Sequence, residues 1–98
     1  MSKEKALSYI GKATRRAFMK QMGNNGKDEK AFVDLVQLLN DLELLVVSNV
    51  KSKAERVLRK MYSEKWNEYI GDGANSQNRL FKSESYFAVK NVLDILTL

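Results

Sequence analysis

Apolar side chains recur at three- and four-residue intervals through four successive stretches of this chain, and no proline interrupts them. This spacing places apolar groups along one stripe of an α-helix, whereas a half-buried strand would alternate every second residue. Four of the five glycines fall in two clusters, at positions 23 and 26 and at 71 and 73, where helices would end. The pattern predicts an all-α fold, a compact antiparallel bundle of about four helices that forms a single domain over residues 1–98.

Two helices are predicted in the N-terminal half of the chain. The first runs from about Ser2 to Met22 and has an apolar stripe rich in alanine: Ala6, Leu7, Ile10, Ala13, Ala17 and Phe18. The second is capped by Asp28 and ends near Ser48, and its predicted buried face holds Phe32, Leu35, Val36, Leu39, Leu42 and Val46. Because this second segment is the most apolar, we expect it at the centre of the bundle.

Two more helices are predicted in the C-terminal half. The third spans Ser52 to Ile70 and starts with a capping box, in which Ser52 and Glu55 satisfy each other's backbone N–H groups. Its apolar side holds Ala54, Val57, Leu58, Met61, Tyr62 and Tyr69. One long bent helix in place of the second and third is the alternative. A polar loop from 71 to 82 follows, and a fourth helix opens at Ser83, unless a short extra turn forms within residues 75–81.

The fourth predicted helix has an apolar stripe that covers about half of its circumference. The stripe holds Val89, Val92, Leu93, Ile95 and Leu96. A stripe of this width has two interpretations. Either the helix is sandwiched inside the fold, or part of it, including Phe87 and Leu98, meets a second copy and forms a homodimer through the C-terminal helix.

Basic side chains gather on two of the predicted helices. Residues 1–26 carry six basic side chains and one acidic, and residues 51–70 carry six and three, within a net charge of +5. We expect a first basic ridge on the first helix, opposite its apolar stripe, made of Lys5, Lys12, Arg15, Arg16 and Lys20. A second basic ridge on the third helix is made of Arg56, Arg59 and Lys60. If the two helices are neighbours, the ridges could straddle the phosphates of a nucleic acid or grip an acidic protein surface. The alternative is that both are ordinary solvated faces of a lysine-rich protein.

Two further features bear on binding. The junction at 48–51 is short enough for a helix-turn-helix with the third helix as recognition helix, but the preceding helix is too long for such a motif. In addition, Trp66 and Tyr69 stand where polar, base-reading side chains are needed. Trp66 lies at the edge of the apolar arc of the third helix, near Arg59 and Ile70. It is either a residue at the rim of the core or an interface anchor, since Trp and Arg dominate binding hot spots.

The chain contains no cysteine and no histidine. This excludes zinc sites built on thiolate or imidazole, disulfides, iron–sulfur clusters and nucleophiles activated by a histidine base. Glu64 and Glu68 lie one turn apart, and the neighbouring lysines favour an ion-pair ladder over an acid–base pair. We therefore expect no enzymatic activity, no cofactor and no metal. The longest apolar run is 44–47, against roughly 20 residues for a membrane span, and no signal peptide is evident, so we expect a cytoplasmic protein.

These observations favour a small non-enzymatic regulatory or adaptor protein that binds a protein partner through a helical surface. The surface expected to make contact comprises the first basic ridge and the region of Trp66. The alternative is binding of DNA or RNA through the two ridges. That alternative relies on Lys12, Arg15, Arg16, Lys20, Arg56, Arg59 and Lys60.

Overall fold

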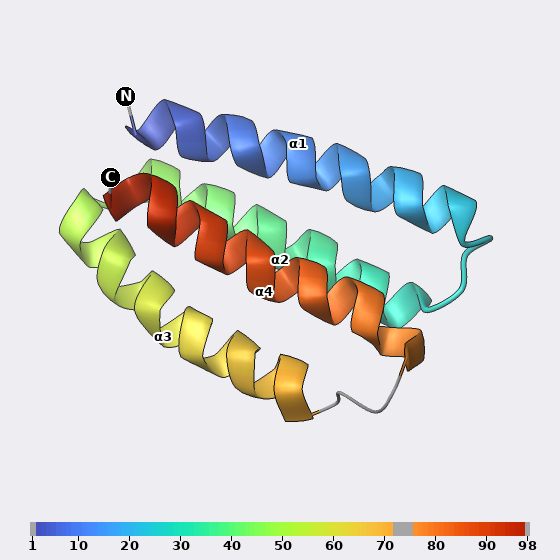
Figure 1. Ribbon diagram of the computed structural model, residues 1–98. Helices are drawn as coiled ribbons and strands as arrows, with labels where there is room; N and C mark the ends of the chain where they lie inside the picture. The colour runs from blue at the N-terminus through green and yellow to red at the C-terminus, as the bar shows by residue number, and fades with distance from the viewer. Residues whose placement is uncertain (1, 72–75, 98) are drawn as a thin grey trace.

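The computed structural model describes residues 2–71 and 76–97, and only the backbone for residues 76–80. It contains four α-helices, α1 (Ser2–Gly23), α2 (Glu29–Ser48), α3 (Lys51–Gly71) and α4 (Ser76–Thr97). Consecutive helices run in opposite directions, so that α1 begins and α4 ends at the same end of the bundle (Figure 1). The prediction of an all-α, four-helix antiparallel bundle is confirmed.

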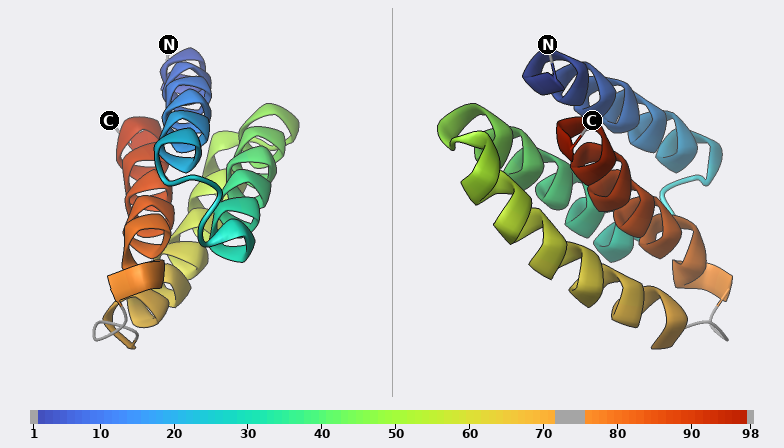
Figure 2. Two further views of the ribbon diagram at one scale, coloured as in Figure 1. Left: turned by 90° about the vertical axis from the view of Figure 1, so that its right-hand side faces the viewer. Right: turned by 60° about the vertical axis from the view of Figure 1, so that its left-hand side comes forward.

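The central helix of the bundle is α4, which packs against each of the other three. α1 packs against α2 and α4, and in the described residues it makes no contact with α3. Figure 2 shows α1 and α3 on either side of the pair formed by α2 and α4. The prediction that the second helix is central is wrong, because α2 barely contacts α3. The wide apolar stripe of α4 fits its sandwiched position, the first of the two interpretations. Phe87 is exposed and Leu98 lies outside the described residues, so the second interpretation stays a prediction.

The core is mostly aliphatic, draws on all four helices and includes the fully buried ring of Phe81, which was predicted to lie in the polar loop. Its fully buried side chains include Leu35, Leu39, Leu42, Leu58, Val89 and Val92. The three alanines of the α1 stripe are also buried, as predicted, and their small size allows close packing against α2 and α4. Three details of the predicted stripes are wrong: Leu38 is buried while Val36 is only half-buried, the side chain of Val57 is 38% exposed, and that of Phe18 is 49% exposed. No helix in the described ranges is long and apolar enough to cross a bilayer.

The helix ends differ from the predicted ones. Asp28 occupies the N-cap position of α2 but has a left-handed backbone (φ 56°) and makes no side-chain cap hydrogen bond. The N–H of Ala54 donates to the carbonyl of Val50 at 3.0 Å, so α3 starts before Ser52, and the predicted capping box lies inside the helix. α4 begins at Ser76 instead of Ser83. Most of the predicted extra turn is therefore part of α4, and the rest of the predicted loop, at 72–75, lies outside the described residues.

Candidate binding surface

The first basic ridge lies on the outside of α1, as predicted, but two of its members have partners on α4. Lys12, Arg15 and Arg16 are exposed and Lys20 is half-buried. Lys20 forms an ion pair with Glu84, and the Arg16 guanidinium lies 3.7 Å from the other carboxylate oxygen of Glu84. These contacts hold α1 to α4, so two of the five members of the ridge stabilise the fold. Within the described residues, Lys12 and Arg15 make no ion pair.

The second basic ridge is exposed on α3, where Arg56, Arg59 and Lys60 all face solvent. The sequence hypothesis of a two-ridge phosphate clamp required the first and third helices to be neighbours. In the described residues they are not, because α2 and α4 lie between them. The two ridges therefore do not form one continuous basic surface across two adjacent helices.

Five aromatic side chains meet where α3 packs against α4, and we call them the aromatic cluster. They are Tyr62, Trp66, Tyr69, Tyr86 and Phe87. Tyr86 is at the centre: its ring is stacked on Tyr69 (centroids 5.7 Å apart, planes 12° apart) and lies 5.2 Å from Trp66. These geometries are the offset-stacked and tilted arrangements that aromatic quadrupoles favour. The cluster fixes the orientation of rings that are otherwise on the molecular surface.

A hydrogen bond between two phenols ties the cluster together. The hydroxyl oxygens of Tyr62 and Tyr86 are 2.9 Å apart, and either can be the donor. This hydrogen bond, together with burial, raises the pKa of Tyr86 from 10.0 to about 12. Nearby on α4, the amine of Lys90 donates to Asp94 at 2.8 Å, and this hydrogen bond raises the pKa of Lys90. The Tyr86 phenol is therefore neutral near pH 7.

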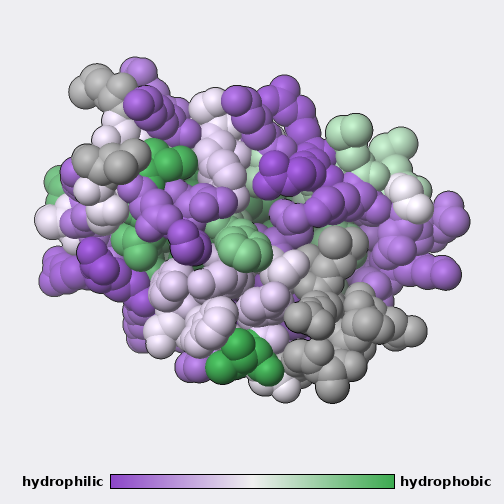
Figure 3. Space-filling view, viewed as in Figure 1, coloured by the Kyte–Doolittle hydropathy of each residue, from purple (hydrophilic) through white to green (hydrophobic). Residues whose placement is uncertain are grey.

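The outer edge of the aromatic cluster is open to solvent. The side chains of Trp66 and Phe87 are 42% and 46% exposed, and that of Ile70, one turn beyond Trp66 on α3, is also exposed. We call Trp66, Ile70 and Phe87 the aromatic patch. Arg59 lies two turns before Trp66 on the same side of α3. Figure 3 shows the face of the molecule seen in Figure 1, where hydrophilic surface lies over much of α1 and weakly polar surface with scattered hydrophobic groups lies over α4 and part of α3.

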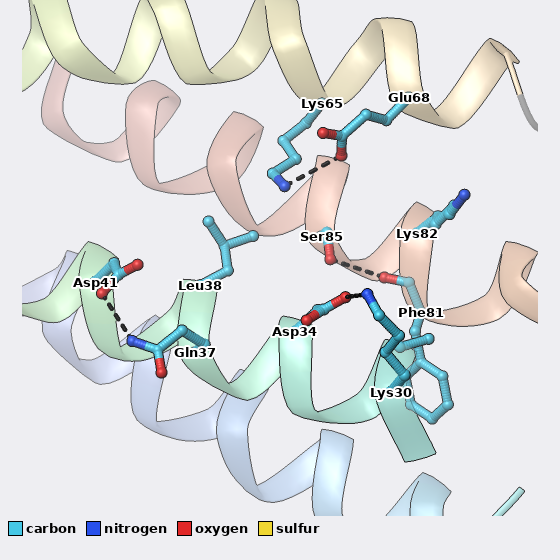
Figure 4. Close-up of a pocket in the computed structure, with 11 residues that line it drawn as sticks. Lys30, Asp34, Gln37, Leu38, Asp41, Lys65, Glu68, Phe81, Lys82 and Ser85 are labelled. Atoms are coloured by element: carbon cyan, nitrogen blue, oxygen red, sulfur yellow. Dashed lines mark hydrogen bonds and ion pairs between the residues drawn. The ribbon is translucent and has the colours of Figure 1, made fainter. Parts of the chain in front are cut away.

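A cleft of about 520 Å³ separates α2 from α3, where these helices scarcely touch. Its floor is formed by Leu38, Phe81 and Ser85, and its walls are polar (Figure 4). The charged groups of the walls pair among themselves: Lys30 with Asp34 at 3.4 Å, and Lys65 with Glu68 at 3.1 Å. Ligand pockets are usually apolar with a few convergent polar groups, whereas here the polar groups are engaged by their neighbours. In the described ranges, no three acidic side chains come together as a cation site would require.

The chain matches no protein-family model, no curated protein and no solved structure.

Two residues of this surface were not anticipated as site residues. Glu84 neutralises part of the first basic ridge, and Tyr86 organises the aromatic cluster. Adjacent aromatic residues at 86 and 87 were visible in the sequence, but helical periodicity could not show that they meet Trp66. Trp66 lies at the rim of the core, the first of its two interpretations, because its ring packs on Tyr86 while the side chain is partly exposed. The interpretation as an interface anchor stays a prediction.

Proposed function

We propose that this protein is a small non-enzymatic regulatory or adaptor protein that binds a protein partner through the aromatic patch. The observation that carries the proposal is the half-exposed edge of a fully packed aromatic cluster, at Trp66 and Phe87. Trp, Tyr and Arg are the residue types that most often dominate the energetics of protein interfaces. Arg59 on the same side of α3 supplies the third type.

The packing of the rings favours tight binding. Side chains that must be ordered on binding cost roughly 0.5–1.5 kcal/mol each. The stacking of Tyr69 on Tyr86, and the contact of Trp66 with both, already hold these rings in place. The free-energy cost of ordering these side chains is therefore smaller when a partner covers them.

The surroundings of the aromatic patch indicate the chemistry of the partner. Arg59 flanks it on α3, and Lys12 lies on α1, which packs on the other flank of α4. The acidic groups near α4 are engaged, since Glu84 pairs with Lys20 and Asp94 pairs with Lys90. A partner segment with apolar anchors and flanking acidic side chains, such as an amphipathic acidic helix, matches this surface.

The test uses the full chain immobilised as bait in a lysate of its source organism. Wild type is expected to retain a stoichiometric protein that Trp66→Ala and Phe87→Ala lose. Met19→Ala is the matched control, because Met19 is an exposed apolar side chain of α1 outside the aromatic patch. Circular dichroism confirms that each variant is folded. Retention that is equal in all variants, or no retained protein at all, refutes the proposal.

Nucleic-acid binding is the competing outcome of the same experiment. It would rely mainly on Lys12 and Arg15, the exposed cations of the first basic ridge that have no ion pair in the described residues. A gel shift whose affinity falls steeply with salt, and which Arg15→Glu abolishes, would replace the protein-binding proposal.

A further inference from the structure

α2 is apolar on two opposite sides. Its inner side forms the centre of the core, with Leu35, Leu39 and Leu42. On its outer side, Val33, Leu44 and Val47 are 52%, 57% and 55% exposed. A surface helix normally has one apolar stripe and a charged opposite face. A second, exposed stripe is a feature of faces that another chain covers.

The residues of the outer stripe of α2 have the same spacing in both directions from its middle. Its members are Val33, Val36, Asn40, Leu44 and Val47, spaced by three, four, four and three residues. Asn40 is at the middle, with two aliphatic side chains on each side. In an interface with two-fold symmetry the same patch is used by both copies, so side chains at equal distances on the two sides of the axis meet, and here they are aliphatic on both sides. Two α2 helices crossing antiparallel at Asn40 would place Val33 of one copy beside Val47 of the other.

α1 extends the apolar surface beside the N-terminal half of the stripe. The ring of Phe18 contacts Phe32 edge-on, with centroids 5.2 Å apart, and Phe18 remains half exposed. A groove of about 340 Å³ runs along α2 here, lined by Thr14, Phe32, Val33, Val36, Gln37, Asn40 and Glu43. In the antiparallel crossing, Leu44 and Val47 of the second copy face this groove and would fill it.

The charges at the two ends of α2 also match an antiparallel pairing. Glu29 stands at its N-terminal end, exposed and flanked by the exposed Lys27 and Lys30, of which Lys30 pairs with Asp34. The C-terminal end is basic: the amine of Lys3 donates to the carbonyl of Val47 at 3.5 Å, and Lys51 begins α3. An antiparallel second copy brings each Glu29 towards the basic end of the other α2, whereas a parallel copy would bring like charges together.

We propose that the outer stripe of α2 is the two-fold interface of a homodimer in which the α2 helices of two copies cross antiparallel at Asn40. This differs from the predicted dimer through the C-terminal helix, since α4 is occupied by the other three helices. The aromatic patch stays open in this dimer, because α2 packs on α4 through its inner side. The dimer thus presents two copies of that patch.

The first test is sedimentation of the purified full chain over a range of concentrations. Wild type is expected to dimerise, and Leu44→Glu to weaken dimerisation at least tenfold while remaining helical. Ser63→Glu is the control, since Ser63 is an exposed side chain of α3 outside both the outer stripe and the aromatic patch. A wild-type chain that is monomeric throughout overturns the proposal. Two other results would also overturn it. One is a Leu44→Glu variant that dimerises as tightly as wild type. The other is a monomeric wild type that binds a different protein and loses that protein when Leu44 is changed.

The second test uses the absence of cysteine from the chain. At a two-fold axis a residue faces its own counterpart, so Asn40→Cys is expected to form an intermolecular disulfide rapidly under mild oxidation. Val33→Cys alone is expected to cross-link slowly, and Val33→Cys combined with Val47→Cys to cross-link fast. If Asn40→Cys cross-links no faster than Ser63→Cys, at an exposed position of α3, the antiparallel crossing is refuted. The failure of this test leaves the aromatic patch proposal standing, because the two surfaces are on different helices.

Discussion

Leu58 anchors α3 to the bundle, and its truncation should reveal how weakly that helix is held. α3 packs chiefly on α4 and contributes only Ala54 and Leu58 to the fully buried core. Leu58→Ala removes three buried carbons, worth roughly 2.4 kcal/mol at about 0.8 kcal/mol each. A residual cavity of roughly 40 Å³ adds about 1 kcal/mol. The expected loss of about 3 kcal/mol is a large part of the ~5–15 kcal/mol that stabilises a domain of this size.

The assay is urea unfolding followed by circular dichroism. With a slope of roughly 1.5 kcal/mol per molar urea, the unfolding midpoint of Leu58→Ala should fall by about 2 M. Val57→Ala is the matched control: Val57 precedes Leu58 but is 38% exposed, and the helix propensity of alanine offsets part of the loss, so we expect a change under about 1 kcal/mol. Equal effects of the two substitutions, or a loss under about 1 kcal/mol for Leu58→Ala, would refute this account of the core.

Three further predictions follow from local features. The pKa of Tyr86 is raised to about 12 in the folded chain, so the stability that this neutral phenol contributes is complete below pH 10 and is lost as the pH rises from 10 towards 12. Tyr62→Phe should lower this pKa towards 10, as read from tyrosinate absorbance, and an unchanged titration would contradict the hydrogen bond. Glu84→Gln should destabilise the fold by less than about 1 kcal/mol, more at low salt than at high salt, because the ion pairs with Arg16 and Lys20 are partly solvated; a salt-independent effect would argue against them. Gly26 has a φ of 74°, so Gly26→Ala should lower the free energy of unfolding by about 1 kcal/mol in thermal unfolding. Gly11 lies in open space within α1, so Gly11→Ala should raise that free energy by roughly 0.5–1 kcal/mol, and a change of the same sign in both variants would contradict the turn geometry.

The number of helices and most of their buried faces could be predicted, because apolar spacing alone fixes the side of a helix that faces the core. The alanines of α1 and the valines of α4 are buried as their spacing indicates. What periodicity cannot give is the identity of the neighbouring helix. For that reason the central position of α4 and the separation of the two basic ridges were not foreseen.

The candidate surface depended on contacts between distant segments, which is why the sequence showed only part of it. Trp66 was singled out by residue type, but its packing on Tyr86 follows from how α3 lies against α4. The pairing of Arg16 and Lys20 with Glu84 likewise joins α1 to α4. The start of α4 was placed too late because the polar residues after 75 carry no apolar stripe for a helix pattern to detect.

The most direct measurement for the role of the aromatic patch is an equilibrium titration of the purified partner with wild type and with each point variant. Replacing Trp66 by alanine should weaken the complex at least tenfold, which corresponds to about 1.4 kcal/mol, while Met19→Ala should leave the dissociation constant within twofold. Trp66 is the only tryptophan of the chain, so its fluorescence should also shift when wild type is saturated. Equal affinities of the two variants, with no change in that fluorescence, would contradict the assignment of this surface.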